Sequence, residues 1–153
     1  MIDEKMIVYR SVYDKKGKNM KINMETDYAF RIMRCLAQRN AVTDARTVSE
    51  LTEVPQRFTL KILGKLVGGG VVTSHKGANG GYELSRPADT ITLRTILEIV
   101  EGPLVISRCL SEDFVCRHDE EHGDCVCYFN RVFDEINMLI ADKLDSVTIA
   151  DSL

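Results

Sequence analysis

Apolar residues recur at intervals of three and four along much of the chain, which is the spacing of one face of an α-helix. The first such stretch predicts an amphipathic helix, and its apolar residues are Tyr28, Ala29, Ile32, Met33, Leu36 and Ala37. Cys35 lies within this stretch, and we interpret it as a small buried hydrophobe.

Two shorter helices are predicted next. Thr47 and Glu50 have the spacing of a capping box, which would begin the first of them with Val48 and Leu51 facing inward. Pro55 separates the two, because a proline disfavours helical conformation in the residue before it. The second helix would end at the glycines at 68–70, and its predicted apolar face is Leu60, Leu63, Leu66 and Val67.

A β-hairpin is predicted immediately after the second helix. Residues 71–74 and 81–84 are short strand candidates, and the glycines and Asn79 between them permit the positive φ angles of a tight turn. A helix-turn-helix followed by a hairpin is the order of a winged helix-turn-helix. We therefore expect a mainly α-helical fold with a small hairpin wing, whose second helix enters the major groove of double-stranded DNA.

Two more helices are predicted in the second half of the chain. Thr92 would cap a helix that ends near Gly102. A longer helix follows, with an apolar stripe of Phe129, Val132, Phe133, Ile136, Leu139, Ile140 and Leu144. Because this stripe is too apolar to face water on a small domain, we expect a homodimer that places two recognition helices on one face of DNA.

Composition indicates one globular domain, or a small domain with an appendage. The chain has 153 residues, of which 44% are hydrophobic and 28% charged. No apolar run is long enough for a membrane span, and residues 1–19 have acidic residues and no apolar signal region. We therefore expect a cytoplasmic protein without a membrane partner, in which residues 1–19 form an extension.

The net charge of −3 conceals a basic region. Between Arg57 and Arg86 there are five basic residues and one acidic residue, Glu83, and local charge decides what a surface attracts. The residues expected to contact bases are Arg57, Phe58, Thr59 and Lys61, at the start of the second helix. The residues expected to contact phosphates or to shape the wing are Lys65, His75, Lys76, Gly77 and Asn79.

Four of the five cysteines lie within residues 109–127, a segment that also holds six acidic residues. Soft thiolates suit both zinc and iron–sulfur clusters, but the spacings lack the paired Cys-x2-Cys arrangement typical of zinc sites. The acidic neighbours disfavour a catalytic thiol, because they raise thiol pKa values. Zinc binding, which could include His118 and His122, and thiol oxidation without a cluster remain alternatives to an iron–sulfur cluster.

Several short motifs resemble one family of bacterial regulators. They are TDYAFR at 26–31, GANGGYELSRP at 77–87, ITL at 91–93, EGP at 101–103 and SVTIAD at 146–151. In this order and together with the cysteines, they resemble the IscR/NsrR/RirA-type winged helix-turn-helix transcription regulators, from about residue 20 to the end. The resemblance implies a homodimeric DNA-binding regulator, with a repressor favoured, and not an enzyme.

The resemblance also implies a [2Fe-2S] or [4Fe-4S] cluster on the segment before the dimerisation helix. The family's three cysteine ligands match Cys109, Cys116 and Cys127, and Asn130 stands where some members have a histidine ligand. The fourth ligand is then either Cys125 or Asp27 from the other subunit, which matches an acidic ligand in other members.

The resulting organisation has four parts. Residues 1–19 are the extension, 20–103 the winged helix-turn-helix domain, 104–127 the cysteine segment, and 128–153 the dimerisation helix and tail. Relatives without the three cysteines answer to a metabolite or a partner protein, so a cluster-free regulator is the alternative function. The signal, among iron supply, nitric oxide and redox state, stays open.

Overall fold

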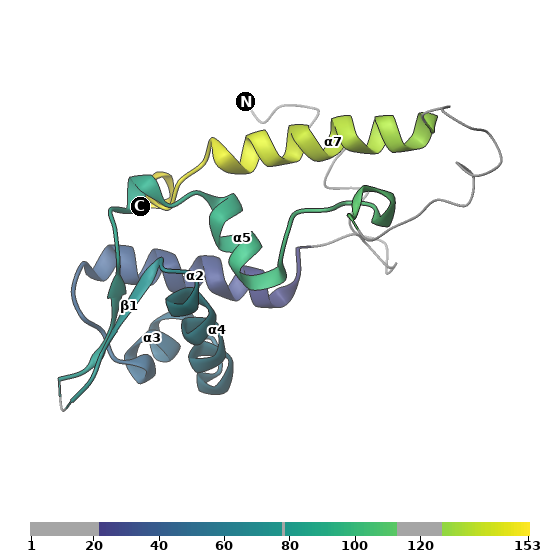
Figure 1. Ribbon diagram of the computed structural model, residues 1–153. Coiled ribbons are helices and arrows are strands. Elements are labelled where there is room, and N and C mark those ends of the chain that lie inside the picture. Colours follow the sequence, from purple (N-terminus) through teal and green to yellow (C-terminus); the bar gives the residue numbers. More distant parts are fainter. Residues whose placement is uncertain (1–21, 78, 113–126) are drawn as a thin grey trace, which may run out of the picture.

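The computed structural model describes residues 22–77, 79–112 and 127–153. Three helices come first, α2 (Met24–Arg39), α3 (Ala45–Thr52) and α4 (Gln56–Gly68), followed by the hairpin of β1 (Val72–His75) and β2 (Gly81–Leu84). Helix α5 (Leu93–Glu101) and the long α7 (Tyr128–Asp145) complete the main elements (Figure 1). Short 3-10 turns lie at η1 (Ala88–Thr90), η2 (Arg108–Leu110) and η3 (Ala150–Ser152). The winged helix-turn-helix prediction is confirmed.

One core joins the helices. Ile32 and Met33 of α2, Ile62 and Leu63 of α4 and Ile96 of α5 have no exposed surface. Burying side chains of this size contributes about 1.5–3 kcal/mol each to the free energy of unfolding. The core therefore fixes the position of α4 on α2 and α5, which leaves the other face of α4 toward the solvent.

Three local predictions for α3 and α4 are wrong. Helix α3 begins two residues before the predicted cap, because Asp44 accepts hydrogen bonds from the backbone N–H groups of Arg46 and Thr47, both at 3.0 Å. Leu51 is 56% exposed and Leu60 is 47% exposed, so neither lies on the inward face that spacing predicted. In each helix, the buried face therefore includes fewer of the apolar residues than the spacing predicted.

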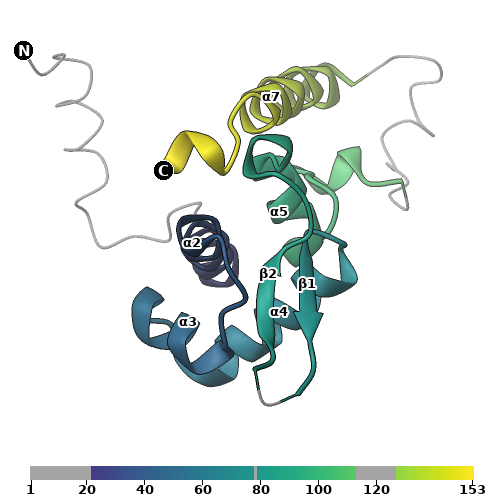
Figure 2. The same cartoon turned by 90° about the vertical axis from the view of Figure 1, so that its left-hand side faces the viewer.

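The hairpin is joined to the helices at its base. Its antiparallel register pairs Val72 with Leu84 and His75 with Gly81, so β1 begins one residue later than predicted. Thr43, before α3, forms an antiparallel β-bridge with Tyr82. The N–H of Thr43 donates to the Tyr82 carbonyl at 2.9 Å, and the N–H of Tyr82 donates to the Thr43 carbonyl at 2.8 Å. A Cβ atom at Gly81 would lie 2.6 Å from the Thr43 carbonyl oxygen, so only glycine fits at this junction. Figure 2 shows the wing beside α3 and α4.

Both views place α7 on the far side of α5 from the α3–α4 pair (Figures 1 and 2). After α7 the chain returns to the core. The N–H of Ile149 donates to the Ile91 carbonyl at 2.9 Å, the N–H of Leu93 donates to the Val147 carbonyl at 2.9 Å, and Ile149 is only 1% exposed. The tail after α7 is thus part of the helix-turn-helix core, which the sequence division at residue 103 did not anticipate.

Candidate DNA-binding surface and cysteine segment

The solvent-facing side of α4 begins with Arg57. Its guanidinium carbon lies 4.6 Å from the ring centroid of Phe58, which is itself half-buried. This stacking holds the cation at the amino end of α4, where winged helix-turn-helix proteins present side chains to base edges. Lys61 lies one turn later and is also exposed.

Thr59 does not belong to this surface. It has no exposed surface, and its hydroxyl donates to the Val54 carbonyl at 3.1 Å across the turn between α3 and α4. The predicted base contact is therefore wrong, because a fully buried hydroxyl cannot reach a base edge. Its role is to satisfy backbone acceptors where the chain turns.

Lys65 is also directed inward. Its ammonium donates to the Val100 carbonyl at 2.7 Å and lies 2.9 Å from the Glu25 carboxylate. The same carboxylate pairs with Lys61 at 3.0 Å. The hydrogen bond from Lys65 lowers the pKa of Glu25 most, and the hydrogen bond from Lys61 lowers it further. Lys65 therefore links α2 to α5 in this structure, and its expected phosphate contact stays a prediction.

Two residues on the exposed side of α4 were not predicted. Leu60 and Gly64 come three and seven positions after Arg57, so the three residues share one face of the helix. All three are exposed. A Cβ atom at Gly64 would meet nothing within 4 Å, so this turn of the helix presents a flat surface. The absence of a side chain at Gly64 was visible in the sequence, but the exposure of Leu60 was not.

Aromatic and arginine side chains continue from α4 onto α2. The rings of Phe58 and Tyr28 have centroids 6.1 Å apart, and the guanidinium carbon of Arg31 lies 5.8 Å from the Tyr28 ring. Arg31 is in turn 2.8 Å from the Asp27 carboxylate. A contact chain therefore connects Asp27, the candidate fourth cluster ligand, to Arg57 at the start of α4.

The wing carries the remaining candidate contacts. His75, Lys76, Gly77 and Asn79 are all exposed, and Gly77 has a φ of 106°, which favours glycine. The imidazole Nε2 of His75 lies 2.7 Å from the Glu83 carboxylate on the adjacent strand. The contact fixes His75 on the strand pair and leaves Lys76 as the unpaired cation near the tip, among the described residues.

Of the candidate cluster ligands in the cysteine segment, the described part of the chain contains Cys109 and Cys127, whereas Cys116 and Cys125 lie outside it. Cys127 immediately precedes α7, and Cys109 is in η2. The Asn130 side-chain amide donates to the Cys109 carbonyl at 2.9 Å, so the first turn of α7 is attached to η2. Both thiols are half-buried and lie at the same end of α7.

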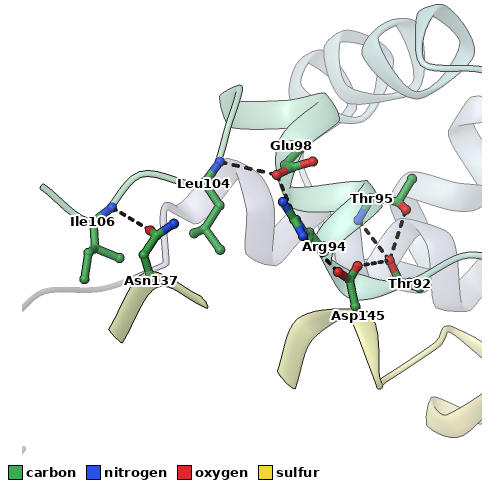
Figure 3. A network of polar contacts seen from close by, with 8 residues as sticks. All are labelled: Thr92, Arg94, Thr95, Glu98, Leu104, Ile106, Asn137 and Asp145. Atoms are coloured by element: carbon green, nitrogen blue, oxygen red, sulfur yellow. Dashed lines mark hydrogen bonds and ion pairs between the residues drawn. The ribbon is translucent and has the colours of Figure 1, made fainter. Parts of the chain in front are cut away.

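A polar network connects α5, α7 and the chain that follows α5 (Figure 3). Arg94 of α5 binds Glu98 at 3.0 Å and Asp145 of α7 at 2.9 Å. Glu98 accepts a hydrogen bond from the Leu104 N–H, and the Asn137 side chain accepts one from the Ile106 N–H at 3.1 Å. The chain between α5 and Cys109 is thereby held along α7.

Within 22–77, 79–112 and 127–153, no three His, Cys, Asp or Glu side chains gather at a distance that would hold a metal ion. The donor chemistry nevertheless suits an iron–sulfur cluster, because two half-buried thiols lie on either side of the segment that carries the other two cysteines. Asp27, the candidate fourth ligand, is exposed on α2.

This fold, with a basic exposed helix beside a hairpin wing, defines a winged helix-turn-helix DNA-binding protein. The chain belongs to the Rrf2 family, described as iron-dependent transcriptional regulators, whose family model matches residues 22–153. The family consists of regulators rather than enzymes.

Individual relatives agree with this assignment. An rrf2-like HTH-type transcriptional regulator of Rhodobacter capsulatus is 29% identical over 137 residues, which cover 86% of this chain and 91% of the relative. Among solved structures, IscR of T. potens has a TM-score of 0.67 at 24% identity, covering 88% of this chain and 86% of that one. CymR, the global cysteine regulator of B. subtilis, has a TM-score of 0.64 at 26% identity, covering 87% and 95%. No helix among the described residues is long and apolar enough to cross a membrane.

Proposed function

We propose that this regulator is a homodimeric, cytoplasmic transcription repressor whose DNA affinity is controlled by an iron–sulfur cluster. The observation that carries the proposal is the attachment of Cys109 to the start of α7 through Asn130, so that Cys109 and Cys127 lie at one end of α7. The cluster ligands would be Cys109, Cys116 and Cys127, completed by Cys125 or by Asp27 of the partner subunit. When bound, an iron–sulfur cluster supplies a group that iron supply, nitric oxide or redox state can alter.

The DNA contacts in this proposal come from α4 and the wing. Arg57 would read a base edge beside Phe58. Lys61, one turn further along α4, would contact a phosphate instead of the base expected from the sequence, and His75 and Lys76 would contact the DNA backbone or minor groove. Gly77 and Asn79 would shape the wing tip. The surface thus combines a base-reading residue with sequence-independent phosphate contacts.

Helix α7 supports the homodimer. Phe129 and Leu139 are 67% and 69% exposed, and Phe133 and Ile136 lie on the same helix face at 36% and 39%. A stripe of four large apolar side chains at helical spacing is typical of a helix that packs against a second copy. Packing α7 against the partner subunit would also set the distance between the two α4 helices.

Residues of the polar network would carry the response. A change in the position of Cys109 would act directly on Asn130, which is hydrogen-bonded to it. It would also act along the chain on Ile106 and Leu104. Ile106 is hydrogen-bonded to Asn137, and Leu104 is hydrogen-bonded to Glu98. Glu98 and Asp145 share Arg94, so α5 and α7 would move together. The reading helices of the dimer would then change their separation.

The decisive experiment compares the protein with its Cys109→Ala, Cys116→Ala double variant. We expect the anaerobically purified protein to show iron and a visible absorbance band, and the double variant to lose both. Binding to a DNA duplex selected in vitro should differ between cluster-loaded and cluster-depleted protein, and the double variant should match the depleted form. A colourless, iron-free anaerobic preparation, or unchanged binding and response in the double variant, would contradict cluster control.

The alternative is a cluster-free regulator of the same fold. Burial raises the pKa of the Cys35 thiol, so this cysteine is not suited to oxidation. Cys109 is half-buried, with its Sγ 3.1 Å from Ser107 Oγ, and is the better candidate. Under this alternative, a mild oxidant should change DNA binding of iron-free protein, and dithiothreitol should restore it.

A further inference from the structure

A second basic surface lies between α2 and α3, next to the base-reading side of α4. It surrounds a groove of about 470 Å³. Arg31, Arg34 and Arg39 line it from α2, and Leu51 lines it from α3. We refer to this feature as the arginine groove.

The three arginines have different surroundings. Arg31 is paired with Asp27 at 2.8 Å. Arg39 lies in the last turn of α2, where the helix dipole favours a cation. Burial raises the pKa of the Cys35 thiol, and the charge of Arg39 opposes this rise. Arg34 is exposed in the middle of α2 and has no hydrogen-bond or ion-pair partner among the described residues. With three cations and one paired carboxylate, the groove has an excess of positive charge.

The opposite side of the groove is formed by Leu51 and Thr52 of α3. Leu51 is 56% exposed, although its neighbours Val48 and Thr52 on α3 are buried. A guanidinium group matches a phosphate, to which it can donate two parallel hydrogen bonds. An exposed leucine side chain beside it would contact the carbon atoms of a sugar ring. Arginine and leucine side chains on facing helices therefore fit a ligand that has an anionic and an apolar part.

The groove is continuous with the base-reading side of α4. The Arg31 guanidinium lies over the Tyr28 ring, and Tyr28 contacts Phe58, beside Arg57. A DNA strand that passes Arg57 would thus continue toward the groove. This proximity favours a backbone phosphate outside the base pairs read by α4.

We propose that the arginine groove binds a sugar–phosphate unit, with Arg34 as the main phosphate ligand, Arg39 as a second cation and Leu51 as the contact for the sugar. The unit comes either from the backbone of flanking DNA or from a free nucleotide. The proposal rests on the DNA-binding class of the protein and not on a cluster.

The test uses an Arg34→Gln, Arg39→Gln double variant of the full chain. Arg131→Gln is the matched control, because Arg131 is an exposed arginine on α7, outside the groove. The first measurement is the salt dependence of binding to a long random-sequence duplex. Each phosphate contact contributes about 0.9 to the slope of log affinity against log salt, so the double variant should lose about 1–2 units and the control none.

The second measurement separates the two sources. If the ligand is a free nucleotide, thymidine monophosphate should raise the thermal unfolding midpoint of the wild type and the control but not of the double variant, with the salt slope unchanged. If the double variant matches the wild type in both measurements, the proposal is wrong. Circular dichroism verifies that the variants fold, and both measurements work on iron-free protein, so failure of cluster control would not affect them.

Discussion

The carboxylate of Glu25 on α2 lies 3.0 Å from the ammonium of Lys61 on α4. Lys61 is 57% exposed on the side of α4 that would face DNA, so the carboxylate competes with phosphates for this cation. We predict that Glu25→Gln binds DNA more tightly and increases the salt slope by about 1, because one more lysine becomes available to a phosphate.

Glu50→Gln is the control for that experiment. Glu50 pairs with Arg46 within α3 at 2.9 Å, on an exposed helix face. The Glu50→Gln substitution removes one negative charge, as Glu25→Gln does, but frees no cation of α4. Equal changes in the salt slope of the two variants, measured by fluorescence anisotropy, would show a general charge effect and contradict the competition.

Acid should destabilise the fold through three carboxylates. A hydrogen bond from Lys65 lowers the pKa of Glu25. Hydrogen bonds from the side chain and backbone of Thr47 lower the pKa of Asp44. Hydrogen bonds from the backbone and side chain of Thr148 lower the pKa of Asp151. A carboxylate whose pKa is lower in the folded state stabilises fully above its unfolded pKa, about 4, and loses that contribution as the pH falls through the folded value. Urea unfolding midpoints should therefore be constant from neutral pH to about 5 and fall below about 4. A midpoint that rises on acidification would contradict this assignment.

Asp44 should matter more than Thr47 for α3. Asp44 accepts hydrogen bonds from two backbone N–H groups at the start of the helix, whereas Thr47 lies inside it. We expect Asp44→Ala to lower the free energy of unfolding by about 1 kcal/mol, as loss of a helix cap does. Thr47→Ala should cost less, because the backbone contacts of Asp44 remain. The reverse order in urea denaturation would restore the capping box that the sequence suggested.

The tail after α7 should contribute to stability. Ile149 is 1% exposed in the core, and Ile149→Ala should cost about 2–5 kcal/mol, as truncation of a buried isoleucine does. Leu153→Ala provides the comparison, because Leu153 is 59% exposed at the end of the same tail and should change little. Similar unfolding midpoints for the two variants would mean that the tail does not pack as described.

The apolar stripe of α7 should determine the oligomeric state. Leu139 is 69% exposed, and Leu139→Arg would place an unpaired charge in the proposed interface. We expect the dissociation constant of the dimer to rise on the order of a hundredfold, because burying such a charge costs several kcal/mol. Asp134→Arg introduces the same side chain on another exposed face of α7 and should leave the dimer intact. Analytical ultracentrifugation distinguishes the two, and a monomeric wild type would contradict the homodimer.

The sequence by itself predicted the order of the elements. Helices α2, α4, α5 and α7 have apolar residues at helical spacing, and Thr92 and Pro55 mark boundaries that the structure confirms. Such signals depend on neighbours within one or two turns, so they can be recognised without knowledge of the fold. The hairpin is also a local feature, because its glycines permit the turn.

Only the tertiary structure decided which side each residue faces and what it binds. Thr59 and Leu60 are adjacent in the sequence, yet the core buries the hydroxyl residue and exposes the leucine. Glu25 and Lys61 are far apart along the chain, and their pairing depends on how α2 packs on α4. The return of Ile149 to Ile91 likewise depends on the path of the chain after α7. The physical reason is that burial and ion pairing are set by long-range packing, which local spacing does not specify.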